Sequence, residues 1–185
     1  MAVRQIDMEM LISNAYYCKK NFSFEQYKNQ TVDLLYQGFY NFDFDGGPVL
    51  DKYREKYADP AFRIVHHLVV FFVYDNGSLY QSEYDVYCKL CEKCGHKYFS
   101  LDQLLKFRKD LTRDDLKGLT SFIRLLREHI NESFFQNFIY GLVMLALLDN
   151  GELSESAYCG IQSVLKPGFD NCPDYRTIMS RVYKW

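Results

Sequence analysis

The chain has 185 residues, of which 48% are hydrophobic and 17% aromatic, and its formal net charge is −2. A chain of this length and hydrophobicity can fold around its own core, which excludes an intrinsically disordered protein. The slightly acidic balance argues against a nucleic-acid-binding protein, because such proteins normally present a basic face.

The chain contains no recognisable targeting or membrane segment. Residues 1–12 include acidic side chains and no long apolar region, so we do not expect a signal peptide. The longest apolar stretch, residues 134–148, is interrupted by polar residues and is too short to cross a bilayer, so no transmembrane segment is expected. We therefore expect a cytoplasmic protein whose six cysteines are reduced thiols.

Hydrophobic periodicity and capping residues predict helices along the whole chain. Ser23 with Gln26, and Ser100 with Gln103, have the spacing of capping boxes, and Gly95 is typical of the residue after a helix end. The predicted helices cover residues of about 6–20, 23–40, 48–57, 61–74, 81–94, 100–109, 116–129, 131–148, 154–166 and 173–183. No segment alternates like a strand, so the predicted fold class is all-α, a multi-helix bundle.

One stretch occurs twice. Residues 68–79 and residues 142–153 are both apolar runs that end in Asp-Asn-Gly-x-Leu, with Asp75 and Asp149 at equivalent positions. Asn-Gly also favours a β-hairpin, but the second run consists of strong helix formers, and equivalent positions should share one structure. Both runs are therefore predicted to be helices, and each Asn-Gly is expected to supply the left-handed residue that ends its helix.

This arrangement of an apolar helix, an acidic glycine turn and a further helix, repeated after two amphipathic helices, resembles the tellurite-resistance TerB-like helical domain. The resemblance covers about residues 61–169 and implies an internal pseudo-two-fold repeat. Residues 1–60 then form an N-terminal helical extension packed on the core, and residues 61–185 form the repeat domain. Members of that family are linked to stress responses and to assemblies at the membrane face, and are not established as enzymes.

The resemblance also implies a divalent cation at the repeated acidic turns. Where the family places its aspartates this chain has asparagines, and the acids stand one position earlier. The downstream acid is kept as Glu83 in the first copy and is Ala157 in the second, where Glu155 lies nearby. The metal-ligand candidates are therefore Asp75, Glu83, Asp149 and Glu155. The alternative is that the turns only end helices and that the acids interact with helix dipoles.

Three further patterns have weaker metal-binding interpretations. Cys88, Cys91 and Cys94 precede His96 with zinc-like spacing, but no second ligand pair follows, so they are interpreted as core cysteines. The segment 41–46 copies the first half of a calcium loop, but Lys52 stands where a bidentate glutamate is needed. His66 and His67 are adjacent on a helix, where they point in different directions and cannot form one ligand pair.

Two functional hypotheses follow. The first is a non-enzymatic, TerB-like helical module that binds a protein partner and carries a divalent cation at its acidic turns. The second is a metal-free adaptor or inhibitor, for example of phage or mobile-element origin, that acts through an aromatic surface. Tyr16 and Tyr17 are the partner-binding candidates, within a cluster that includes Phe22, Phe24 and Tyr27. No acid–base or nucleophile set is visible, so we do not expect an enzyme.

Overall fold

The computed structural model describes residues 6–40, 80–95, 97–110, 132–165 and 173–183, and every element in these ranges is a helix. The prediction of an all-α chain is therefore confirmed for the described residues. None of their helices has the length and hydrophobicity needed to span a membrane. The helices are α1 (Met8–Asn21), α2 (Phe24–Tyr40), α4 (Gln81–Lys93), α5 (Leu101–Asp110), α7 (Glu132–Leu147), α8 (Glu155–Leu165) and α9 (Tyr175–Arg181).

Local capping interactions set most of the helix ends. The backbone N–H of Ser23 donates to Gln26 and that of Gln26 to the Ser23 hydroxyl, which confirms the predicted capping box before α2. The same exchange joins Ser100 and Gln103 before α5. After α4, Gly95 adopts a φ of +72°, as predicted for a residue that ends a helix.

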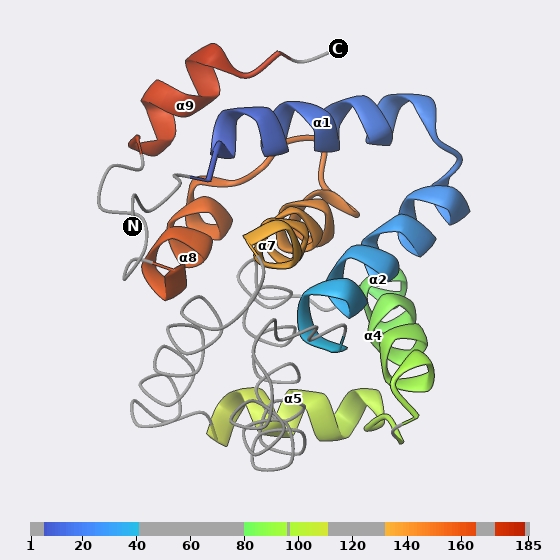
Figure 1. The fold of residues 1–185 in the computed structure, drawn as a ribbon. Coiled ribbons are helices and arrows are strands. Elements are labelled where there is room, and N and C mark those ends of the chain that lie inside the picture. The colour runs from blue at the N-terminus through green and yellow to red at the C-terminus, as the bar shows by residue number, and fades with distance from the viewer. Residues whose placement is uncertain (1–5, 41–79, 96, 111–131, 166–172, 184–185) are drawn as a thin grey trace, which may run out of the picture.

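Helix α7 lies at the centre of the fold, with α1, α2 and α8 around it (Figure 1). Its residues from Phe138 to Leu147 are buried with the exception of Tyr140, so this part of the helix is apolar on nearly all sides. Helix α2 packs on it most closely. A Cβ built on Gly141 would lie 2.9 Å from the Leu35 side chain and 3.0 Å from the Leu35 backbone nitrogen. Only glycine allows the two helices to approach this closely.

The N-terminal helices contribute to the same core as α7. Leu11, Ile12 and Ala15 of α1 and Leu35 of α2 are buried in one cluster with the α7 side chains. The hydroxyl of Tyr27 in α2 donates to the Met144 carbonyl at 2.9 Å. Residues 6–40 are therefore an integral part of the bundle.

Helices α4 and α9 lie on the outside of this arrangement. Helix α4 lies against α2 on the side away from α7, and α9 lies beside α1 (Figure 1). The hydroxyl of Tyr175 in α9 donates to the Leu153 carbonyl at 2.7 Å, and that of Tyr158 in α8 donates to the Pro173 carbonyl at 2.6 Å. Each of these tyrosines thus bonds to the backbone just before the other helix, which connects α8 and α9.

Candidate functional site

The end of α7 carries the second of the repeated Asp-Asn-Gly turns and is capped by a lysine from another helix. The ammonium of Lys19 in α1 donates to the carbonyls of Leu147, Leu148 and Asn150, at 3.2 Å for Leu148. The Asn150 side-chain amide also donates to the Ala146 carbonyl at 3.1 Å. Side chains therefore satisfy carbonyls that the end of a helix leaves without intrahelical partners.

The prediction that a left-handed residue ends α7 at this turn is wrong. Among the described residues only Gly95 has a positive φ, so neither Asn150 nor Gly151 ends α7 in that way. The physical reason is the capping by Lys19 and Asn150, which makes the backbone reversal of a left-handed cap unnecessary. The equivalent turn of the first copy, with Asp75, lies outside the described residues.

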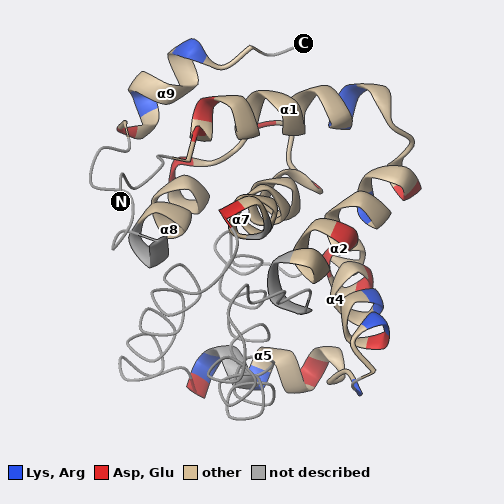
Figure 2. Cartoon of the chain, viewed as in Figure 1, with Lys and Arg blue, Asp and Glu red and all other residues tan. Residues whose placement is uncertain are grey.

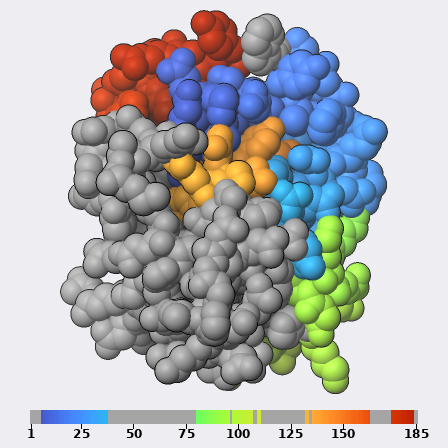
Figure 3. All heavy atoms as spheres, in the orientation of Figure 1, coloured from blue at the N-terminus to red at the C-terminus, as the bar shows by residue number. Residues whose placement is uncertain are grey.

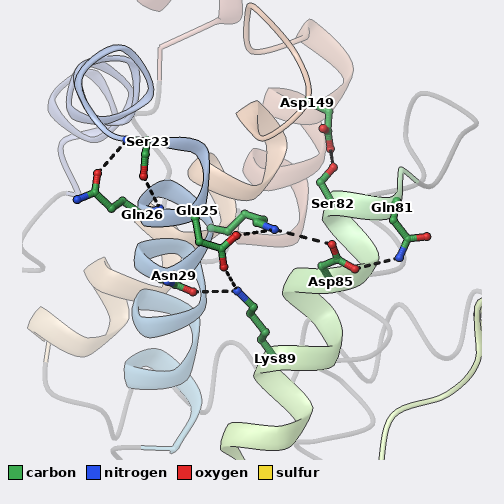
Figure 4. A network of polar contacts seen from close by, with 10 residues as sticks. Ser23, Glu25, Gln26, Asn29, Gln81, Ser82, Asp85, Lys89 and Asp149 are labelled. Atoms are coloured by element: carbon green, nitrogen blue, oxygen red, sulfur yellow. Dashed lines mark hydrogen bonds and ion pairs between the residues drawn. The ribbon is translucent and has the colours of Figure 1, made fainter.

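Two of the four predicted metal ligands, Glu83 and Asp149, lie near each other. Asp149 accepts a hydrogen bond from the hydroxyl of Ser82 in α4, next to Glu83 (Figure 4). Residue Glu83 is 3% exposed, and its carboxylate accepts a hydrogen bond from the backbone N–H of Tyr80 at 2.9 Å. Burial, together with the nearby charge of Asp149, raises the pKa of Glu83 to about 7, although the Tyr80 hydrogen bond opposes the shift.

The other two metal candidates do not join this pair in the described structure. Glu155 is exposed in the first turn of α8, and Asp75 is outside the described residues. Within the described ranges no three or more His, Cys, Asp or Glu side chains are grouped so that they could hold a metal ion. The prediction of a four-carboxylate site thus has support only for the proximity of Glu83 and Asp149.

A divalent cation is a poor fit to this pair. Such an ion needs several oxygen ligands that converge on one point. Here Asp149 already accepts from Ser82 and interacts electrostatically with Lys19, while Glu83 accepts from Tyr80. Burial lowers the pKa of Lys19 from its usual value, and Asp149 opposes that shift. The described oxygens at the end of α7 are thus arranged around an ammonium group.

The cysteines in and directly after α4 pack against the core, as interpreted from the sequence. Cys91 is buried, and Cys88 and Cys94 are partly buried against the same core. Burial raises the pKa of Cys88, and it raises that of Cys91 to about 12, so both favour the protonated thiol in this environment. The remaining metal-like patterns, at 41–46, at 66–67 and at His96, lie outside the described residues.

The structure corrects one of the two partner-binding candidates. Tyr16 is only 8% exposed, and its hydroxyl accepts a hydrogen bond from the Leu153 backbone N–H at 2.9 Å. The Tyr16 side chain faces the interior because residues 12, 15, 16 and 18 lie on the buried side of α1. Tyr17, one position further, is 50% exposed. Of the neighbouring cluster, Tyr27 is buried, whereas Phe22 and Phe24 are 38% and 52% exposed.

A polar network between α2 and α4 was not anticipated from the sequence. Glu25 pairs with Lys28 at 2.9 Å and with Lys89, and Lys28 also lies 3.8 Å from Asp85 (Figure 4). Figure 2 shows charges of both signs along these two neighbouring helices. The i, i+4 spacing of Asp85 and Lys89 could have suggested a charged face, but no sequence pattern indicated which helix lies opposite.

Comparisons with known proteins identify no relative. No protein-family model matches the chain, and neither the curated proteins nor the solved structures searched contain a significant match.

Proposed function

We propose that this chain is a non-enzymatic helical protein-interaction module that contacts its partner through the corner between α1 and α2. The surface consists of Tyr17, Phe22 and Phe24, which we call the aromatic corner. The observation that carries the proposal is the exposure of all three rings within eight consecutive residues. Exposed apolar side chains that are grouped in this way are typical of interaction sites, and aromatic residues are enriched at interfaces.

The backbone of the aromatic corner is held in place before any partner binds. The N–H of Phe22 donates to the Cys18 carbonyl at 2.9 Å, which closes the end of α1. The Ser23–Gln26 capping box then fixes the start of α2. Because this backbone is already ordered, binding would require little additional loss of conformational entropy.

The two helices that meet at the corner form one continuous outer surface. Figure 3 shows the atoms of α1 and α2 adjoining along the upper right of the molecule. Lys28 lies with its ammonium 5.4 Å from the centre of the Phe24 ring, a cation–π contact that restricts this exposed side chain. Lys28 is itself buried and paired with Glu25, so the aromatic corner presents rings, and not a lysine charge, to a protein partner with apolar side chains.

Kinship with the TerB-like domains remains part of the proposal. Its support is the sequence repeat, together with the helix, turn and helix formed by α7, residues 149–151 and α8. Glu83 in the first turn of α4 stands where the family keeps its downstream acid. The first copy of the repeat turn lies outside the described residues.

A capture experiment tests the proposal. The tagged wild-type chain is used to isolate partners from the native host, and the purified partner is then titrated with a Tyr17→Ala/Phe24→Ala double variant. Loss of two aromatic anchors should weaken binding by at least about tenfold, because interface aromatics often contribute more than 1 kcal/mol each. Tyr98→Ala is the matched control, since Tyr98 is 48% exposed but lies in the α4–α5 connection.

Unchanged affinity of the double variant for a captured partner would show that the aromatic corner is not the binding surface. Equal weakening by Tyr98→Ala would show that the effect is not specific to this corner. Circular dichroism of each variant would establish that the helices are retained.

A further inference from the structure

We propose that the oxygen-lined site at the end of α7 is a cation site whose permanent occupant is the side chain of Lys19. The TerB-like resemblance implies a divalent metal ion at the repeated turns. In the second turn this chain supplies its own ammonium group instead. This inference does not depend on the partner surface proposed above.

The hydrogen-bonding capacity of Lys19 matches the site completely. A lysine ammonium has three N–H donors and no acceptor. The structure provides three backbone oxygens, those of Leu147, Leu148 and Asn150. Three donors therefore meet three acceptors, all of which come from one short segment of backbone.

Burial disfavours the charged form of Lys19 and lowers its pKa, but two local features act in the opposite direction. Carbonyls at a helix C-terminus carry partial negative charge, which stabilises a cation there. The neighbouring Asp149 adds a full negative charge that favours the protonated form of Lys19. The Lys19 ammonium is thus bound by backbone carbonyls at the end of α7, next to Asp149 of the same turn.

A second cation of higher charge would have to compete with Lys19. Asp149 also accepts a hydrogen bond from the hydroxyl of Ser82 in α4 (Figure 4). Together with the Lys19 contacts, this bond makes the turn a connection between α1, α7 and α4. Because Lys19 is covalently part of the chain, its effective concentration at the site is high and independent of cellular metal levels. The resulting structure is constitutive and does not respond to metal.

Chemical rescue of the full-length chain tests this inference. Lys19→Ala removes the ammonium and three methylene groups, so its melting temperature should fall by roughly 5 °C or more, since backbone carbonyls lose a charged partner. Added n-propylammonium chloride should recover part of the loss. Tetramethylammonium chloride at the same concentration should not, because it has no N–H donor. Lys20→Ala is the matched control, since Lys20 is exposed on the same helix.

If Lys19→Ala does not fold in plain buffer, refolding in the two salts is compared by circular dichroism, with the same expectation. In parallel, the wild-type chain and the Asp149→Asn variant are titrated with Ca²⁺, Mg²⁺ and Mn²⁺ by calorimetry. The two proteins should show the same heats, because no divalent cation is expected to bind at Asp149. The inference is overturned by Asp149-dependent divalent binding in the wild type, by equal melting of the Lys19 and Lys20 variants, or by equal rescue with both salts.

Discussion

The side chain of Leu35 in α2 lies directly against the backbone of Gly141 in α7, and a Cβ at Gly141 would come within 2.9 Å of it. This contact joins the helix that carries part of the aromatic corner to the central helix of the bundle. The position of α2 therefore depends on the absence of one side chain.

Gly141→Ala should destabilise the protein by about 1–3 kcal/mol despite the higher helix propensity of alanine. The added methyl group would also meet the Leu35 backbone nitrogen at 3.0 Å, so rotation of the Leu35 side chain alone cannot relieve the clash. Urea denaturation measures the change. Gly151→Ala is the control, since a Cβ there would meet nothing within 4 Å. Equal stability of the two variants would show that the close approach of α2 is not required.

Ionisation of Glu83 should make the protein less stable as the pH rises from about 4.5 to about 7. Because the pKa is raised from 4.5 to about 7 on folding, the folded chain binds more protons than the unfolded chain in this window. Above about pH 7, the resulting loss in the free energy of unfolding can reach about 3 kcal/mol.

Glu83→Gln should remove this dependence, since the amide oxygen can still accept from Tyr80 but does not titrate. Denaturant unfolding of both proteins between about pH 5 and 8 tests this, with Glu155→Gln as the control at an exposed position. Parallel pH profiles of the wild type and Glu83→Gln would contradict the assignment.

Tyr27→Phe should cost about 1 kcal/mol, the typical contribution of one buried hydrogen bond. The Tyr27 ring is 2% exposed and its hydroxyl donates to the Met144 carbonyl, so the variant removes the donor and keeps the apolar packing. Thermal unfolding provides the measurement. Tyr17→Phe changes an exposed hydroxyl and should have no comparable effect. A smaller loss for Tyr27→Phe than for Tyr17→Phe would be incompatible with the structure.

Alkylation should distinguish the cysteines by burial. Cys159 is exposed on α8, whereas Cys91 is 1% exposed and burial raises its pKa to about 12. Because the thiolate is the reactive form, iodoacetamide at neutral pH should modify Cys159 before Cys91. Peptide mapping by mass spectrometry follows each site separately. The difference should disappear in denaturant, and rapid modification of Cys91 in the native protein would argue against its position in the core.

Within the described residues, local sequence patterns predicted the helices and many of their ends, because these depend on nearby residues; the predicted helices at 48–57, 61–74 and 116–129 lie outside those residues. The Ser23–Gln26 and Ser100–Gln103 capping boxes and the glycine at position 95 are interactions within a few residues, and all three are present. The apolar run before Asp149 also indicated the buried helix α7 correctly. The proximity of Glu83 and Asp149 was suggested only by the internal repeat.

Contacts between side chains far apart in the sequence could be identified only in the folded chain. Asn-Gly at the end of α7 predicted a left-handed cap, but Lys19, more than a hundred residues earlier, satisfies the carbonyls instead. Tyr16 and Tyr17 are adjacent and chemically identical, yet one is buried against Leu153 and the other is exposed, because a helix turns about a hundred degrees per residue. Local patterns determine secondary structure, whereas long-range packing determines which side chains become partners.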